Sequence, residues 1–257
     1  MGKVYLVGAG PGDPELLTLK AAKLLAIAEV VLHDSLVSRE VLAMISRRAL
    51  VVDVGKRCGK KLLTQEEINT LLVSYGKSHA VVVRLKGGDP SIFGRAAEEL
   101  EALRKASVDC EVVPGVTAAL GAAAAAGIAL TDRRAASQVL FATFSREAGA
   151  PAPDWACLTA ATTLVLYMPG PDYAEVARGL EDAGLPQDLP CAVVSNASGP
   201  DQRILWSSVG ALAHEEKLPA PALMIVGRVA AQHVREIEST FWRAQDRGEP
   251  QRTISVI

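Results

Sequence analysis

The segment Arg84-Leu85-Lys86-Gly87-Gly88-Asp89-Pro90 most constrains what this chain can fold into. It follows an apolar run, Ala80 to Val83, which is typical of a buried strand in a parallel sheet. The chain therefore passes from a strand directly into a loop with two glycines, an acid and a proline. In open α/β sheets such loops lie at the carboxyl ends of strands, where ligands bind. A tight turn followed by a helix cap is the alternative, because Gly and Asp are also ordinary turn and cap residues.

A second loop of this kind, Gly8-Ala9-Gly10-Pro11-Gly12-Asp13-Pro14, follows the strand-like residues 3–7. It shares two glycines with the dinucleotide fingerprint G-x-G-x-x-G, but Asp13 stands at the third glycine position. An acid at a helix entrance repels a pyrophosphate, and Pro11 removes a backbone donor. The loop therefore argues against an NAD or ATP site. Asp13 is predicted instead to cap a helix over 14–28 that begins with proline.

Composition narrows the class of protein. The 257 residues are 49% hydrophobic and 22% charged, which is typical of a well-packed globular protein of one large or two ordinary domains. A net charge of −2 argues against nucleic-acid binding. The chain enters a strand directly and contains no apolar stretch typical of a membrane span, so we expect no secretory signal, no membrane association and a cytoplasmic location. Its four cysteines have no C-x-x-C spacing, so we expect reduced thiols and no metal site.

Alternating strand and helix patterns predict an α/β protein with two lobes, 1–113 and 114–240, and a tail over 241–257. The break between the lobes is placed at Pro114-Gly115. Thr64 and Glu67 form a predicted capping box at the start of one helix. Strands are predicted over 3–7, 29–33, 50–54, 80–85, 110–113, 139–144, 163–167, 192–195, 202–207 and 222–226. Helices are predicted over 14–28, 38–45, 94–105, 116–126 and 173–183, in addition to the one that begins after Thr64.

A cluster of cations, Lys56-Arg57-Cys58-Gly59-Lys60-Lys61, follows the strand-like residues 51–54. Such runs are most often solvated surface. At the carboxyl end of a strand, beside glycine loops, the cluster is also a candidate receiver for an acidic substrate.

Eight motifs together resemble one family. They are Gly8-x-Gly10-Pro11-Gly12-Asp13, Leu16-Leu17-Thr18, His33-Asp34-Ser35-Leu36-Val37, Val54-Gly55-Lys56-Arg57, Gln65-Glu66-Glu67-Ile68-Asn69, Arg84 to Pro90, Ile92-Phe93-Gly94-Arg95 and Val113-Pro114-Gly115-Val116-Thr117-Ala118. In this order they resemble the uroporphyrinogen-III C-methyltransferases of the tetrapyrrole methylase superfamily, over residues 3 to about 229. Each motif alone is weak, but their common order makes chance agreement implausible.

The resemblance implies a two-lobed α/β homodimer with its cofactor cleft between the lobes. The cofactor is S-adenosylmethionine, its product is S-adenosylhomocysteine, and no metal is used. The implied reaction adds two methyl groups to carbons of uroporphyrinogen III and gives precorrin-2, on the routes to sirohaem and cobalamin. A cofactor that is not held on a phosphate loop agrees with the failed dinucleotide fingerprint.

The resemblance also implies site residues. Asp34 matches the family's proposed proton acceptor, although it could instead cap the segment 36–41. Lys56 matches the proposed proton donor, and we favour a role in holding a substrate carboxylate because an unburied lysine stays charged at neutral pH. The positions that match cofactor-binding residues are Pro11, Gly87, Gly88, Asp89, Ile92, Thr117, Ala118, Met168, Ala197 and Ala222.

The implied substrate carries eight carboxylates, so we expect cations around it. Arg57, Lys60, Lys61, Arg95 and Arg133 are the candidates. Arg95 could instead balance Glu98 and Glu99 on its own helix.

Several residues depart from the family pattern, among them His33, Ser91, Ala96-Ala97, Asp132, Ser145 and Ala197-Ser198. Most of the departures concern substrate-side positions, so the sequence indicates the cofactor more firmly than the substrate. Two alternatives follow: a methyltransferase for another precorrin-type tetrapyrrole, and a paralogue that binds the cofactor with weak turnover.

Overall fold

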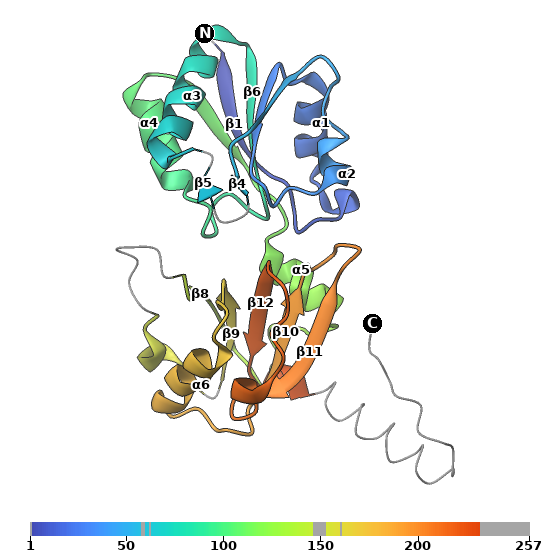
Figure 1. Ribbon diagram of the computed structural model, residues 1–257, viewed down its shortest axis with the longest axis vertical. Coiled ribbons are helices and arrows are strands. Elements are labelled where there is room, and N and C mark those ends of the chain that lie inside the picture. Colours follow the sequence, from blue (N-terminus) through green and yellow to red (C-terminus); the bar gives the residue numbers. More distant parts are fainter. Residues whose placement is uncertain (1, 58–59, 62, 146–152, 160, 232–257) are drawn as a thin grey trace, which may run out of the picture. The chain divides into compact units, whose positions relative to one another are not determined.

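The computed structural model describes residues 2–57, 60–61, 63–145, 153–159 and 161–231 (Figure 1). The chain forms two compact units, Met1–Gly121 and Ala122–Ile257. Both are mixed α/β units, as the sequence predicts. No helix in the described part of the chain is long and apolar enough to cross a membrane.

The first unit is built on a five-stranded parallel sheet in the order β3-β2-β6-β1-β7. Its strands are β1 (Lys3–Gly8), β2 (Val30–His33), β3 (Leu50–Asp53), β6 (Val81–Lys86) and β7 (Asp109–Val113). Because all five run the same way, the loops after them leave from one edge of the sheet. The cation cluster adds a short antiparallel hairpin, β4 (Lys56–Arg57) and β5 (Lys60–Lys61), which the sequence patterns did not predict.

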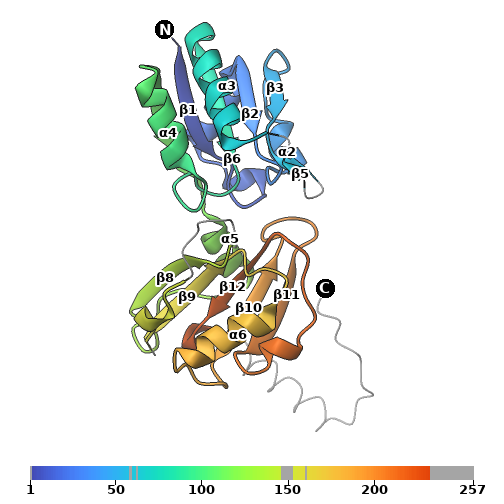
Figure 2. The same cartoon turned by 60° about the vertical axis from the view of Figure 1, so that its left-hand side comes forward.

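Helices cover both faces of this sheet (Figures 1 and 2). Helices α1 (Leu19–Ile27) and α2 (Arg39–Leu42) pack on the face that carries Val83 and Leu85 of β6. The opposite face, which carries Val82, is covered by α3 (Gln65–Ser78) and α4 (Ala96–Lys105). Successive residues of a strand point to opposite faces, so an apolar strand such as β6 can supply both cores.

The predicted helix over 14–28 is wrong in its first part. Residues Pro14–Leu16 form a separate 3₁₀ turn, and Asp13 caps that turn by accepting a hydrogen bond from the Glu15 amide at 2.8 Å. The backbone is extended at Leu17 and Thr18, which ends the turn. Thr18 then caps α1 through the amide of Ala21 at 3.2 Å. A proline and an acid mark a helical start, but they do not fix how far it continues.

The helix predicted over 38–45 is also shorter, since α2 covers Arg39–Leu42 and turns follow it. The capping box at α3 is confirmed. The Glu67 amide donates to Thr64 Oγ1 at 3.2 Å, and the Thr64 amide donates to Glu67 Oε2 at 2.6 Å. Each partner satisfies a backbone donor that the first helical turn leaves free.

Helix α5 (Ala118–Ala125) spans the division between the units. The second unit contains a five-stranded sheet in the order β11-β10-β12-β9-β8. Of the four strand pairs in this sheet, β8 and β9 are parallel and the other three are antiparallel. The strands are β8 (Gln138–Thr143), β9 (Thr162–Tyr167), β10 (Pro190–Ser195), β11 (Arg203–Ser208) and β12 (Ala222–Val226). All five were predicted, with end residues that differ by at most two positions.

One face of the second sheet is covered by α6 (Tyr173–Asp182) and the 3₁₀ turn Leu212–His214. Val176 and Leu180 of α6 are fully buried there against Leu164, Val193 and Met224. Short 3₁₀ turns also occur at Trp155–Cys157 and Arg228–Ala230. Most of the predicted polar loop 147–153 and the whole tail 241–257 lie outside the described residues.

Candidate functional site

Three loops meet at the carboxyl edge of the first sheet. They follow the adjacent strands β6, β1 and β7, and the two glycine-rich loops are hydrogen-bonded to each other. The Gly88 amide donates to the Gly10 carbonyl at 2.8 Å, and the Gly10 amide donates to the Gly88 carbonyl at 3.2 Å. The two motifs singled out in the sequence therefore form one structural element.

Glycine is required here because the loop backbones lie in contact. A Cβ atom on Gly115 would lie 2.4 Å from the Gly88 carbonyl oxygen and 2.8 Å from the Gly8 Cα. A Cβ on Gly8 would lie 2.6 Å from the same oxygen. Gly88 has a φ of +66°, in the left-handed region that favours glycine. The edge thus presents backbone rather than side chains, as the sequence predicts for a site where a ligand approaches the main chain.

Asp89 ties these loops together. Its Oδ2 accepts a hydrogen bond from the Gly115 amide at 2.9 Å. Its Oδ1 accepts from the amide of Ser91 at 2.8 Å and from the Ser91 hydroxyl at 2.5 Å. Asp89 is therefore at the predicted site, and its carboxylate holds the loop after β6 against the start of the loop after β7. Ser91 departs from the family pattern, and a residue without a hydroxyl at this position would keep the amide donor and remove the hydroxyl donor.

The remaining first-unit residues predicted to bind the cofactor lie on the same three loops. Pro11 follows Gly10, and Gly87 precedes Gly88, with its Cβ position 3.2 Å from Leu36 Cβ. The amide of Ile92 donates to the Asp89 carbonyl at 3.3 Å. Thr117, which is 8% exposed, precedes the first residue of α5, Ala118. The fold thus brings together seven predicted residues, Pro11, Gly87, Gly88, Asp89, Ile92, Thr117 and Ala118.

Asp34 lies at the same edge, directly after β2. Its carboxylate accepts a hydrogen bond from Arg84 Nη2 at 2.5 Å, and its side chain is 30% exposed. The alternative in which Asp34 caps the segment 36–41 is wrong. The cap of α2 is Ser38, whose hydroxyl accepts from the Val41 amide at 3.3 Å. Asp34 is therefore a partly exposed carboxylate with a buried cationic partner.

Beside Asp34 lie three buried charged residues: sequence reasoning gave no role to two of them, Arg84 and Lys86, and considered the third, Glu99, only as a partner of Arg95. Arg84, Lys86 and Glu99 are 2%, 3% and 0% exposed. Glu99 Oε1 accepts from Arg84 Nε at 2.9 Å and from Lys86 Nζ at 3.0 Å. The signal in the sequence was the pair of cations at alternate positions of an otherwise apolar strand, because alternate positions share one face.

For some of the predicted substrate-binding cations the structure describes only the backbone, and for others it also describes the side chain. The backbones of Lys56, Arg57 and Lys60 lie in the β4–β5 hairpin, with Lys56 opposite Lys61 and Arg57 opposite Lys60, but their side chains are outside the description. Arg95 binds Glu98 through two hydrogen bonds of 2.7 Å. Balance by Glu98 is thus observed, whereas Glu99 pairs with Arg84 and Lys86.

Arg133 is exposed in the turn closed by the bridge between Asp132 and Ala136. Its neighbour Asp132 is bound by Arg134, with Nη2 2.7 Å from Oδ2 and Nε 3.0 Å from Oδ1. These hydrogen bonds lower the pKa of Asp132 to about 2. In the segment Asp132-Arg133-Arg134, which departs from the family pattern, Asp132 therefore forms an ion pair with Arg134.

In the second unit, the predicted residues Met168, Ala197 and Ala222 lie at one edge of the sheet. Met168 follows β9, and Ala222 begins the adjacent strand β12. Ala222 is paired with Ser195, the last residue of β10, and Ala197 follows shortly after it. Met168 is 46% exposed and has a φ of +50°. Non-glycine residues are uncommon in this region of φ, and strained residues of this kind cluster at active sites and ligand clamps.

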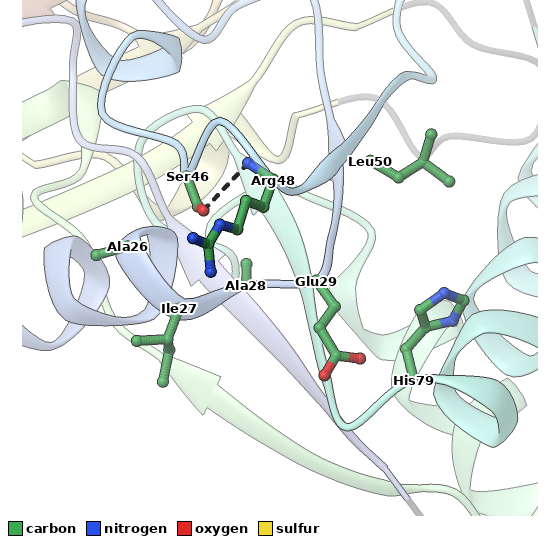
Figure 3. A pocket seen from close by; sticks show the side chains of 8 residues that line it. All are labelled: Ala26, Ile27, Ala28, Glu29, Ser46, Arg48, Leu50 and His79. Carbon is green, nitrogen blue, oxygen red and sulfur yellow. Dashed lines mark hydrogen bonds between the residues drawn. The ribbon is translucent and has the colours of Figure 1, made fainter.

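The opposite edge of the first sheet holds a hollow of about 520 Å³ (Figure 3). It lies at the amino ends of the strands, among residues such as Glu29, Arg48, Leu50 and His79. Glu29 is already used there, since its carboxylate accepts from the Ala80 amide at 2.8 Å. None of the predicted site residues lines this hollow, so we do not place the site there. Within the described residues, no three His, Cys, Asp or Glu side chains gather as metal ligands would.

Comparison with known proteins decides the family. Residues 3–213 match the family described as Tetrapyrrole (Corrin/Porphyrin) Methylases. The chain belongs to this family.

Curated relatives in this tetrapyrrole methylase family are close in sequence. A uroporphyrinogen-III C-methyltransferase of Paracoccus denitrificans is 49% identical over 236 residues, which cover 90% of this chain and 82% of the relative. One from Synechocystis is 45% identical, with 89% of each chain covered. A siroheme synthase of Psychrobacter cryohalolentis is 46% identical, but the chain spans only 45% of its length.

Solved structures of the family share the fold. Uroporphyrin-III C-methyl transferase from Thermus thermophilus, in complex with S-adenyl homocysteine, is 41% identical, with a TM-score of 0.79. The match covers 89% of this chain and 98% of that one. A cobalt precorrin-4 methyltransferase is 31% identical over 89% of this chain, with a TM-score of 0.78.

Proposed function

We propose that this tetrapyrrole methylase is an S-adenosylmethionine-dependent C-methyltransferase that converts uroporphyrinogen III to precorrin-2 by two methylations. The observation that carries the proposal is the backbone-lined edge formed by the glycine loops of β1, β6 and β7, in a chain 49% identical to a named uroporphyrinogen-III C-methyltransferase. The additional activities of the longer siroheme synthases are not part of this proposal.

The residues at this edge fit a small polar cofactor better than a dinucleotide. Three loop backbones offer amides and carbonyls, and the Asp89 carboxylate fixes their spacing. Asp13 faces its own 3₁₀ turn, where a pyrophosphate would meet a negative charge. We propose that Pro11, Gly87, Gly88, Asp89, Ile92, Thr117 and Ala118, together with Met168, Ala197 and Ala222, bind S-adenosylmethionine and its product S-adenosylhomocysteine. When bound, this cofactor supplies an electrophilic methyl group on a sulfonium.

The protein then has two tasks, which are to orient the substrate and to take up a proton. Alignment of the reacting atoms is the main requirement of a displacement at a methyl carbon. Loss of a proton from the macrocycle needs a base, and we assign this role to Asp34, which is partly exposed at the same edge as the glycine loops. Lys56, Arg57, Lys60, Arg95 and Arg133 are proposed to bind substrate carboxylates. Exposed ion pairs contribute up to about 1 kcal/mol each, so several are needed.

We further propose a homodimer in the cytoplasm. The finding that supports this part is the family membership itself, through the resemblance stated above. Light scattering coupled to size exclusion measures the mass directly, and a particle of 27.0 kDa, the mass of one chain, would contradict the dimer.

The activity is tested by incubating the chain with methyl-labelled S-adenosylmethionine and enzymatically prepared uroporphyrinogen III. Two methyl groups per macrocycle are expected, without added metal. One methyl or none, together with transfer to a later precorrin, would favour the alternative supported by the likeness to the cobalt precorrin-4 methyltransferase. Cofactor binding without transfer to any tetrapyrrole would indicate the weak-turnover paralogue.

Asp34→Ala tests the assigned base. Cofactor affinity is expected to stay unchanged while turnover falls, because Asp34 pairs with Arg84 and takes no part in the contacts between the glycine loops. A full rate in this variant would remove Asp34 from the chemistry.

A further inference from the structure

The buried charges beneath Asp34 form a connected chain of contacts. Arg84 and Lys86 lie at alternate positions of β6, on the sheet face covered by α3 and α4. Glu99 reaches them from α4 and is fully buried. Gln65, the first residue of α3, lies 3.4 Å from the same Glu99 oxygen through Nε2. Of the two carboxylates, that of Asp34 is the more exposed, so this series of contacts runs from the proposed site into the core.

The Arg84 guanidinium is held on three sides. Its Nε donates to Glu99 Oε1 at 2.9 Å. Its Nη1 lies 3.3 Å from the Leu85 carbonyl oxygen and 3.5 Å from that of Leu32. The remaining nitrogen, Nη2, donates to Asp34 at 2.5 Å. Since the guanidinium is planar and rigid, fixing Nε and Nη1 also fixes the direction in which Nη2 points.

Such an arrangement is a poor way to stabilise a core. Buried ion pairs lose hydration that their mutual attraction often fails to return, and apolar residues of similar volume commonly stabilise as well or better. Here one Glu99 oxygen, Oε2, is buried and has no hydrogen-bond partner among the residues that the structure describes. Burial and the nearby Arg84 charge lower the pKa of Lys86, because both disfavour its ammonium form. Val82 on β6 and Leu103 on α4, which belong to the core on this side of the sheet, are ordinary apolar residues.

The Arg84 charge itself is firmly retained. Burial alone would lower its pKa, yet the carboxylates of Asp34 and Glu99 raise it. Arg84 therefore stays a cation and a donor at any pH at which the protein works. Lys86 offsets the second negative charge, because Asp34 and Glu99 together balance Arg84 and Lys86.

We infer that Glu99 is a positioning residue, which fixes Arg84 so that Arg84 holds the Asp34 carboxylate in one orientation for proton removal from the substrate. This inference rests on the proposed role of Asp34. Lys86 neutralises Glu99 and thereby allows it to be buried. Glu99 and Lys86 would touch neither cofactor nor substrate.

The test separates positioning from folding with two variants. Glu99→Gln removes the charge at nearly constant shape but leaves two buried cations facing one carboxylate. In Glu99→Gln/Lys86→Met the charges of Asp34 and Arg84 again balance, so the melting temperature is expected to recover. The matched control is Glu101→Gln, on the same helix, where the carboxylate is 59% exposed and forms an ion pair with Lys105.

We expect kcat of both Glu99 variants to fall about ten- to hundred-fold, because a small displacement of a catalytic group costs this much. The KM for S-adenosylmethionine should stay within about twofold, since the glycine loops are untouched. The control should match the parent. A double variant that is folded and has the parent's kcat overturns the inference. A fall in kcat matched by an equal rise in KM also overturns it, because the damage would then be in the cofactor loops.

A spectroscopic readout keeps the test independent of the proposed reaction. The Arg84 Nε–H signal, assigned by its loss in Arg84→Lys, should exchange slowly with water in the parent and faster in Glu99→Gln. Equal protection in both would overturn the inference even if the parent methylates uroporphyrinogen III. If the parent does not methylate that substrate, the proposed function fails, while this signal still reports whether Glu99 holds Arg84.

Discussion

Gly115→Ala places a methyl group where the backbones of two neighbouring loops already lie. The new carbon would lie 2.4 Å from the Gly88 carbonyl oxygen and 2.8 Å from the Gly8 Cα. Favourable contacts between carbon atoms lie near about 3.5 Å, so one loop must move by roughly 1 Å. The obstructing atoms are main chain and cannot rotate away, as the tip of a flexible side chain can.

The cost follows from the connections that this movement breaks. Overpacking a close-packed site typically lowers the free energy of unfolding by about 1–3 kcal/mol. We expect the upper end, about 3 kcal/mol, because both contacts are with backbone atoms. The loop after β7 is also held by the hydrogen bond from the Gly115 amide to Asp89. For a chain of this size, each kcal/mol lowers the melting temperature by about 2–4 °C, which gives a drop of about 10 °C.

Thermal unfolding followed by circular dichroism measures the loss of stability, and calorimetric titration with S-adenosylmethionine measures the loss of cofactor affinity. The dissociation constant should rise by about tenfold or more, since a loss of only about 1.4 kcal/mol in loop organisation is sufficient. The control is Gly184→Ala, in the second unit, where the Cβ position is open but φ is +82°. It should cost about 1 kcal/mol of backbone strain and leave cofactor affinity unchanged.

The reasoning is refuted if Gly115→Ala melts no lower than Gly184→Ala and binds the cofactor as the parent does. The glycines at this edge would then be dispensable, and the contact between the loops would not be what shapes the site.

Three further predictions test other residues. Asp89→Asn should lower cofactor affinity about tenfold in a calorimetric titration, because the side-chain nitrogen of asparagine cannot accept the hydrogen bond that the Gly115 amide donates to Asp89 Oδ2. Unchanged affinity would show that this hydrogen bond does not matter for cofactor binding. Burial raises the pKa of the Cys191 thiol to about 12, so alkylation of the native protein at pH 8, mapped by mass spectrometry, should label exposed Cys157 and spare Cys191, and equal labelling would contradict this. Asp132 should titrate at about 2 by NMR, so its pairing with Arg134 stabilises the turn above the ordinary carboxyl pKa and is lost as pH falls through about 2; Arg134→Met should return the midpoint toward 3.8.

Much of the fold could be predicted from local patterns. Apolar runs between turn residues located the strands of both sheets, since a strand buried on both faces has a distinctive composition. The capping box at Thr64 and Glu67 marked the start of α3, because both hydrogen bonds lie within four residues. The prediction of one continuous helix over 14–28 was wrong because local patterns mark where a helix begins better than how far it continues. Its start signal was genuine, but Leu17 and Thr18 adopt extended backbone that no start signal encodes.

Part of the candidate site could likewise be predicted from the sequence, and part depends on the tertiary structure. The sequence by itself determined that two glycine loops follow strands, and the order of its eight motifs indicated the family. Only the tertiary structure decided that these loops bond to each other, and that Asp89 is used by the protein's own amides. It also decided the partner of Glu99. Sequence spacing suggested Arg95 on the same helix, whereas burial placed Glu99 against Arg84 and Lys86 on a strand. A charge removed from water must be matched by the opposite charge packed beside it, and packing, not sequence distance, determines which residue that is.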